Sequence, residues 1–195
     1  ALGAAHDAGV DVMVVDHHKC APDLPKTLAL VNPNRLDEIE EAAAHGHLAA
    51  VGVAFLLAIA TVRTLRRRGY FEDRKGPDLL SLLDLVALGP VADVAALRGL
   101  NRAFVAQGLK VMRHRANTGM SALLDASRLQ RAPVCSDLGF ALGPRINAGG
   151  RVGESTLGVR LLTTEDPDEA AEIAKRLSEL NEDRRQIESE VQEEA

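Results

Sequence analysis

The chain has 195 residues and is 46% hydrophobic, which is enough to bury the core of one good-sized domain. Its 23 basic and 28 acidic residues give a net charge of −5, which excludes a uniformly basic nucleic-acid coat and permits a local basic site. Two cysteines are too few for a disulfide framework, and no apolar run is long enough to span a membrane, so a soluble cytoplasmic protein is expected.

The apolar periodicity predicts two short strands followed by helices. The expected ranges are a helix over 1–8, strands over 10–15 and 28–31, and helices over 48–67, 78–88, 101–115, 120–127, 154–162 and from 167 onward. The strand Val10–Val15 is apolar and β-branched, which is typical of a buried parallel strand. We expect the helix over 78–88 to break at Gly89 and Pro90, and residues 130–153, rich in Gly, Pro and Arg, to form an ordered functional loop.

The final helix has the clearest start signal. Asp166 is expected to cap it, with Pro167 at the first helical position and Glu169 three residues after the cap. A narrow apolar stripe then runs along an otherwise charged helix, which favours a connector between domains over a core element. Because the chain starts without Met and ends inside this helix, we expect a piece of a longer protein.

Polar side chains follow the first strand directly. Asp16, His17 and His18 come where the strand ends, which is where open α/β sheets bind ligands. An imidazole can bind a metal, and a neighbouring carboxylate can accept its second ring N–H and fix its tautomer. The alternative is a solvated strand end that happens to be polar. His45 and His47 are interpreted as a polar loop at a helix start.

Two later segments also carry candidate chemistry. Asp93 is an isolated acid in a long apolar stretch, and such an acid is normally paired, hydrogen-bonded or bound to metal, or caps a helix N-terminus. Gly143–Arg151 combines glycines with Arg145, Asn147 and Arg151, which suits a phosphate site because glycine lets backbone amides approach and Arg matches phosphate oxygens. A surface loop is the alternative for this second segment.

Taken in order, these motifs resemble the DHH phosphoesterase superfamily, and within it the bacterial single-stranded-DNA-specific exonucleases. The similar segments are Val15–His18, Val31–Arg35, Gly46–Phe55, Gly89–Asp93, Gly143–Arg151 and Leu161–Thr164. They cover essentially the whole chain. The implied fold is α/β: the C-terminal part of a DHH-type domain with parallel strands and flanking helices over residues 1–163, followed over 164–195 by the start of a long connector helix.

The resemblance implies a role for each residue of the first two motifs. His17 and Asp93 would bind one or both of two divalent ions, Mn²⁺ or Mg²⁺. His18 would contact the phosphate, and Asp16 would support the histidines. The implied reaction is two-metal hydrolysis of phosphodiester bonds from the 5′ end of single-stranded DNA, in repair and recombination, with repair proteins as further partners and no membrane.

In the third motif, Arg145, Asn147 and Arg151 match the stretch that holds the nucleic-acid backbone. Gly149 and Pro90 depart from the family's usual Ala and Thr. The family's Asp-x-Asp element and a further acid precede the DHH strand, and its DHHA1 and OB domains follow the connector. The isolated chain is therefore expected to bind metal weakly and to be inactive. Two alternatives remain: a DHH phosphodiesterase of short oligonucleotides or cyclic dinucleotides, and a non-catalytic DHH-derived scaffold.

Overall fold

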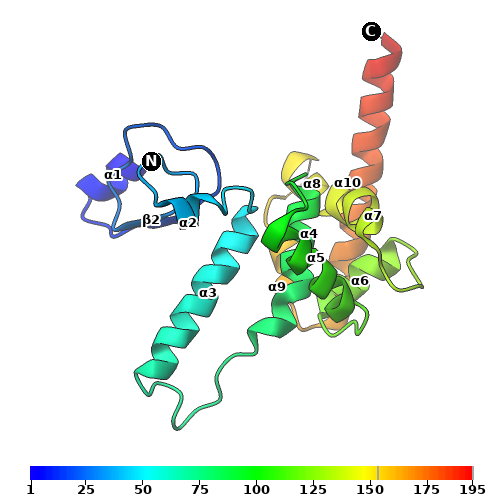
Figure 1. Cartoon of the computed structure of the whole chain (residues 1–195). Helices are drawn as coiled ribbons and strands as arrows, with labels where there is room; N and C mark the ends of the chain where they lie inside the picture. The colour runs from blue at the N-terminus through cyan, green and yellow to red at the C-terminus, as the bar shows by residue number, and fades with distance from the viewer. Residues whose placement is uncertain (153, 195) are drawn as a thin grey trace.

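A computed structural model of the chain describes residues 1–152 and 154–194, with side chains described for 1–150 and 154–192. It is rich in helix and has one small parallel sheet near the N-terminus (Figure 1). The elements are α1 (Leu2–Asp7), β1 (Met13–Val15), β2 (Ala29–Val31), α2 (Glu40–Ala43), α3 (Ala50–Arg67), the 3₁₀ helix η1 (Leu79–Leu82), α4 (Leu83–Ala92), α5 (Gly99–Met112), α6 (Thr118–Ala126), α7 (Cys135–Asp137), the π-helix η2 (Leu138–Leu142), α8 (Gly143–Val152), α9 (Leu157–Thr163) and α10 (Pro167–Glu194). Among the described residues, no helix is both long and apolar enough to cross a membrane.

The two strands are parallel and in the predicted order. Their register pairs Met13 with Ala29 and Val15 with Val31. The prediction of a buried first strand is wrong, because Met13 and Val10 are each 56% exposed. A parallel strand is buried only where helices cover both faces of its sheet. Here Val15 and Val31 pack against a cluster that includes α3, whereas Val10 and Met13 remain exposed to solvent among the described residues.

Two hydrophobic clusters form the core. The smaller one joins the sheet to α3, α4 and α5, and contains Leu48, Val53, Phe55, Leu83, Val86 and Phe104. The larger one joins α4 to the helices that follow it, and includes Met112, Met120, Leu123, Leu138, Leu142, Leu161, Ile173 and Leu177. The close contact between α4 and α5 depends on a glycine, because a Cβ on Gly108 would lie 2.0 Å from the carbonyl oxygen of Leu83.

The predicted break of this helix at Gly89 and Pro90 is wrong, because helix α4 continues through both residues to Ala92. Gly89 serves close packing, because a Cβ there would lie 2.2 Å from Cγ1 of Val51. Pro90 is buried, and its carbonyl oxygen accepts a hydrogen bond from the amide of Ala95. Proline removes one helical donor, so burial among neighbouring helices is what keeps this turn helical.

The prediction of a loop over residues 130–153 is also wrong, because most of the segment is helical from α7 through α8. Glycines stand at buried positions where an amphipathic helix usually has larger apolar side chains, so the segment lacks the apolar periodicity that predicts a helix. Gly143 and Gly149 are buried, and a Cβ on either would lie within 3 Å of Leu138 or Leu177, respectively. The helices pack through backbone at these positions, so no apolar stripe marks them.

Helix α10 starts as predicted. The Asp166 carboxylate accepts hydrogen bonds from the amides of Asp168 and Glu169, at 2.9 and 3.4 Å. The prediction that this helix lies outside the core is wrong for its first half, where Ile173 and Leu177 are buried. From residue 185 the described side chains are exposed, and the helix projects from the bundle toward the C-terminus (Figure 1).

Candidate metal centre

The sheet delivers the Asp-His-His triplet to its carboxyl edge. The amide of Asp16 still donates to the carbonyl of Val31, at 3.0 Å, and the chain leaves the strand at the next residue. Asp16, His17 and His18 each offer one ligand atom, and these atoms all lie within 4.8 Å of one another. Among the described residues this is the one cluster of three or more His, Cys, Asp or Glu side chains compact enough to hold a metal ion.

Asp16 organises the two histidines. Its Oδ1 accepts hydrogen bonds from the amides of His17 and His18, at 2.7 and 3.3 Å, and lies 2.7 Å from Nδ1 of His18. Burial alone would raise the pKa of Asp16, but these hydrogen bonds outweigh it and the pKa lies below its ordinary value. An ionised Asp16 accepts the Nδ1 proton of His18, which leaves Nε2 of that exposed ring available to a ligand.

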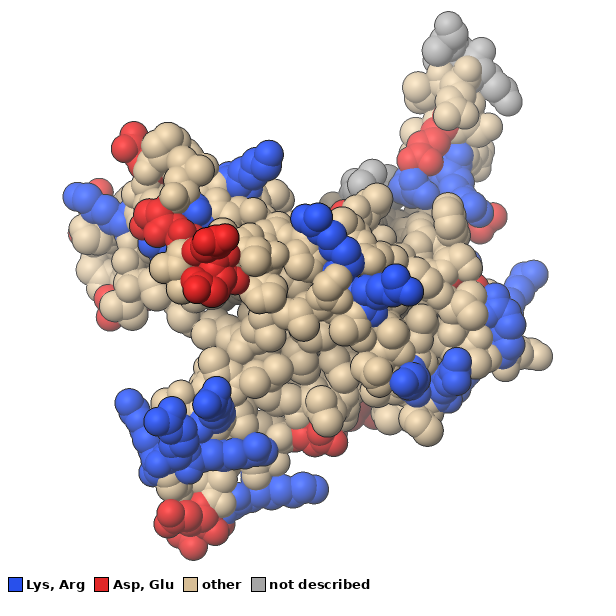
Figure 2. All heavy atoms as spheres, viewed as in Figure 1, with Lys and Arg blue, Asp and Glu red and all other residues tan. Residues whose placement is uncertain are grey.

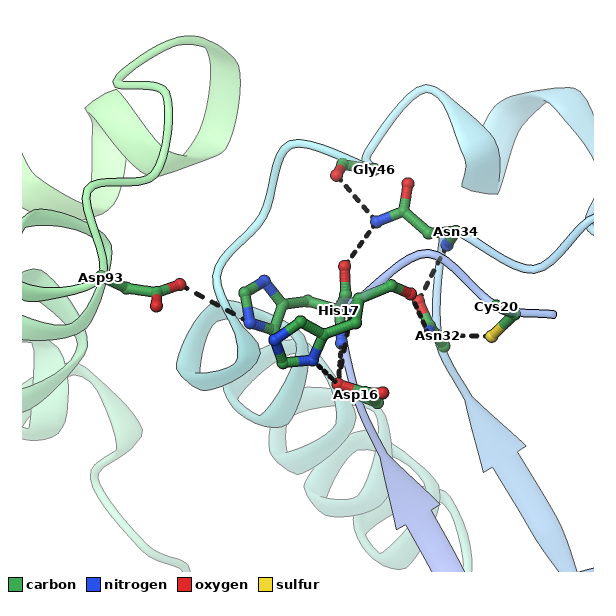
Figure 3. Close-up of polar contacts among 8 residues, drawn as sticks. Asp16, His17, Cys20, Asn32, Asn34, Gly46 and Asp93 are labelled. Atoms are coloured by element: carbon green, nitrogen blue, oxygen red, sulfur yellow. Dashed lines mark hydrogen bonds and ion pairs between the residues drawn. The ribbon is translucent and has the colours of Figure 1, made fainter. Parts of the chain in front are cut away.

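Asp93 meets this cluster from the other side (Figure 3). Its Oδ2 lies 3.5 Å from Nε2 of His17, and the side chains of Asp93 and His17 are 50% and 18% exposed. Asp93 follows the last residue of α4, so it ends a helix and does not cap an N-terminus. It is also half-exposed, although it lies in a long apolar stretch of the sequence. The buried acid is Asp84, which is 3% exposed and whose pKa is raised by burial.

An asparagine pair holds the histidine backbone in place. Asn34 Nδ2 donates to the carbonyls of His17 and Gly46, at 2.7 and 2.9 Å (Figure 3). Asn32 Nδ2 donates to the carbonyl of His18 at 2.8 Å, and its Oδ1 accepts from the amide of Asn34. Sequence reasoning assigned no role to these residues. Their signal was the Asn-Pro-Asn turn, whose side chains commonly bond nearby backbone.

A third asparagine ties the Asp93 side to the same segment. Asn101 is fully buried, and its Nδ2 donates to the carbonyls of His47 and Ala96, at 2.6 and 3.1 Å. Ala96 lies in the loop after Asp93. Gly99 closes that loop with a positive φ of 50°, and a Cβ on it would lie 2.8 Å from Nε2 of His47. The turn at residues 45–47 therefore links the backbone of His17 to the loop that carries Asp93.

Arg145 makes its hydrogen bonds to neighbouring helices. Its Nη1 donates to the carbonyl of Ala141 at 2.7 Å, and its Nε donates to Oγ of Ser178 on α10 at 3.0 Å. Burial lowers the pKa of its guanidinium below the ordinary value, and the positive charge of Arg185 adds to this effect. These contacts connect α8 to α10, so the structure uses Arg145 between helices.

Asn147 is placed beside Asp93. Both line a hollow of about 780 Å³, together with Gly150 and Ser155. Asn147 also lines a smaller neighbouring hollow with Arg184 of α10, a residue to which the sequence analysis gave no role. The side chain of Arg151 lies outside the described residues. The third motif is thus a helix whose Asn147 reaches the site, and the predicted glycine-rich phosphate loop is absent from its described part.

The chain is similar to bacterial RecJ exonucleases over almost its whole length. It is 46% identical to the single-stranded-DNA-specific exonuclease RecJ of Dickeya dadantii and 43% identical to that of Escherichia coli K12, and in both cases the match covers 98% of this chain and 33% of the relative. The chain therefore spans about a third of the length of the curated relatives it matches. No family model matches the chain.

Solved structures show the same fold. A manganese-bound crystal structure of exonuclease RecJ superposes with a TM-score of 0.80 at 33% identity, over 97% of this chain and 45% of that one. RecJ from Thermus thermophilus in complex with Mn²⁺ gives a TM-score of 0.75 at 34% identity, over 95% of this chain and 26% of that one. The arrangement of a small parallel sheet, a helical bundle and a long C-terminal helix is thus the RecJ arrangement for this part of the chain.

Proposed function

We propose that this chain supplies the histidine side of the metal centre of a single-stranded-DNA exonuclease. The observation that carries the proposal is the approach of His17 Nε2 to Asp93 Oδ2, at 3.5 Å, beside the compact triplet. The relatives are named as single-stranded-DNA-specific exonucleases, and the similar structures include complexes with Mn²⁺ and with Mg²⁺.

The donor set fits a divalent ion. Metal–donor distances of about 2.1 Å place two donors of one ion no more than about 4.2 Å apart. The gap between His17 and Asp93 lies inside that limit. An imidazole with carboxylates suits a borderline ion such as Mn²⁺ as well as Mg²⁺. We therefore assign His17 and Asp93 as metal ligands, with Mn²⁺ or Mg²⁺ as the ion.

The remaining residues of the triplet act on the substrate and on orientation. Bound divalent ions supply activation of water and charge stabilisation at a phosphodiester. His18 is exposed and is held at Nδ1 by Asp16, so its Nε2 is free to donate to a phosphate oxygen when that nitrogen is protonated. Asp16 is a positioning residue, because its Oδ1 is occupied by the two following residues.

We propose the wider activity from the resemblance of the motifs, as part of the same proposal. It comprises removal of nucleotides from the 5′ end of single strands, in DNA repair and recombination, in the cytoplasm and together with repair proteins. By the resemblance, Asn147 and Arg151 would hold the DNA backbone, with Asn147 beside Asp93, while Arg145 would maintain α8 on α10. Residues 1–163 would be the catalytic portion and 164–195 the connector. The carboxylates that the family places before the DHH strand would complete the donor set.

Metal binding by the chain itself tests this proposal. Titration with Mn²⁺ should broaden the imidazole NMR signals of His17 and His18 selectively and saturably, because the ion is paramagnetic and its effect is local. His17→Ala should abolish the broadening at His18, and Asp93→Ala should abolish it at both His17 and His18, while His114→Ala, at an exposed site, should not. Equal broadening of all histidines in every variant would overturn the proposal.

Activity is the second arm of the test. The chain alone should leave 5′-labelled single strands intact in Mn²⁺, whereas a longer form that includes an Asp-x-Asp element before β1 should degrade them. His17→Ala in that longer form should remove the activity. Degradation that survives this substitution would show that the reaction does not use the triplet.

A further inference from the structure

A second charged feature lies at the far end of α3 and belongs to no motif assigned above. Six basic side chains gather there: Arg63, Arg66, Arg67, Arg68, Arg74 and Lys75. We call them the α3 basic patch. All six are exposed, and Figure 2 shows a dense group of basic side chains over this part of the molecule. The charge stands out because the whole chain carries a net charge of −5.

The helix end alone does not explain the patch. Cations in a last turn stabilise a helix through its dipole, which accounts for Arg66 and Arg67. Arg74 and Lys75 follow α3 in a loop, and three acids, Glu72, Asp73 and Asp78, lie close to them in the sequence. Among the described residues, none of the six basic side chains forms an ion pair within 4 Å. Their charges therefore remain available to an external anion.

The patch also contains flat surfaces for stacking. The Arg74 guanidinium carbon lies 4.2 Å from the centre of the Tyr70 ring, which is 48% exposed. Phe71 supports Tyr70 edge-on, with ring centres 5.2 Å apart. Beside them is a hollow of about 780 Å³ with apolar side chains, among them Ile59, and an arginine rim that includes Arg66. Single-stranded nucleic acids bind where cations track the backbone and aromatic or guanidinium planes take the bases.

The patch lies one helix length from the candidate metal centre. Helix α3 has 18 residues, so it is about 27 Å long. Its first residues follow the turn that Asn34 ties to His17, and its last residues carry the patch (Figure 1). Sites of about 4 to 16 nucleotides are usual for single-strand grooves, so one flexible strand can reach both places.

We propose that the α3 basic patch binds single-stranded DNA and holds the part of the strand that lies away from the metal centre. This inference rests on the proposed exonuclease function for the identity of the ligand. The negative charge over the rest of the chain directs a polyanion to this patch. The exposed Tyr70 and Arg74 planes favour a nucleic acid over an acidic protein segment, because unpaired bases present faces that stack on them.

Binding measured without metal tests the patch separately from the reaction. The anisotropy of a fluorescent single strand of about 16 nucleotides, a length at the upper end of common site sizes, is followed in EDTA at several salt concentrations. Each phosphate contact on a single strand contributes about 0.7 to the slope of log affinity against log salt. Arg66→Gln with Arg67→Gln should therefore lower the slope by about 1.4, and Tyr70→Ala should weaken binding about tenfold with the slope unchanged.

A matched control separates the patch from loss of charge in general. Lys175→Gln with Arg176→Gln removes the same charge from exposed positions on α10, at the other side of the molecule, and should leave the slope unchanged. A strand of about 4 nucleotides should bind more weakly than the long one, and that difference should shrink in the arginine variant. Melting temperatures of all variants should lie within a few degrees of one another, because every substituted side chain is exposed and the helix-dipole contribution of Arg66 and Arg67 is small.

The outcomes also separate this inference from the proposed function. Patch-dependent binding that persists in His17→Ala supports the inference even where no Mn²⁺ binding is found. Equal salt slopes for the patch and control variants overturn it. It is also overturned if an acidic peptide binds in a patch-dependent way while no single strand binds, since that would identify a protein ligand.

Discussion

Asn34→Ala should weaken the metal centre without touching a metal ligand. The substitution removes two hydrogen bonds, from Nδ2 to the carbonyls of His17 and Gly46 at 2.7 and 2.9 Å. Each neutral hydrogen bond contributes about 1 kcal/mol net, and water can reach these half-buried carbonyls, so the cost in unfolding free energy is about 2 kcal/mol. Residues that orient metal ligands typically change metal affinity by about 10- to 100-fold. We expect a loss of Mn²⁺ affinity in that range.

Two measurements check this prediction: thermal unfolding followed by circular dichroism, and Mn²⁺ titration followed by broadening of the His17 imidazole signals. Asn117→Ala is the matched control. Asn117 caps α6, accepts from the amide of Met120 at 2.7 Å and donates to the carbonyl of Leu162 at 3.2 Å. Its substitution should cost about 1 kcal/mol and leave Mn²⁺ affinity intact. If both variants lost stability and neither lost Mn²⁺ affinity, the positioning role of Asn34 would be refuted.

Three further predictions concern stability. Burial raises the pKa of Asp84, so the carboxyl group ionises at lower pH in the unfolded state than in the folded state. Asp84→Asn should therefore raise the free energy of unfolding by about 1 kcal/mol at pH 7. This gain should disappear below the ordinary pKa of 3.8. The hydrogen bonds from Arg131 hold the pKa of Asp137 below its ordinary value, so their stabilisation is present above pH 3.8 and lost as pH falls further. Asp137→Asn should lower the free energy of unfolding by about 2 kcal/mol at pH 7. Urea titrations at neutral and acid pH should show the difference in stability between the variant and the unsubstituted chain becoming smaller as pH falls. Gly119→Ala would place a Cβ 1.7 Å from the carbonyl oxygen of Leu161 and should lower the free energy of unfolding by about 3 kcal/mol in the same assay. A change under about 1 kcal/mol would mean that α6 and α9 can move apart without a large cost.

The sequence was informative where local rules decide the structure. The apolar run before Asp16 predicted a strand over 10–15, and β1 ends at Val15 as predicted, although it begins only at Met13. Asp166 and Pro167 predicted the start of α10 because an N-cap and a first-turn proline act within a single turn. Segments that depart from apolar periodicity were misinterpreted: Gly143 and Gly149 suggested a loop, and they form a helix that packs through its backbone.

The sequence by itself therefore determined the chemistry of the candidate site. It offered an acid and two imidazoles at a strand end, and an isolated Asp93 far along the chain. Only the tertiary structure decided that Asp93 lies half-exposed beside His17, because that approach depends on how α4 packs against the helices that carry the sheet. The hydrogen bonds of Asn34 and Asn101 were likewise decided by the tertiary structure, since side-chain bonds to distant backbone segments leave no periodic signal in the sequence.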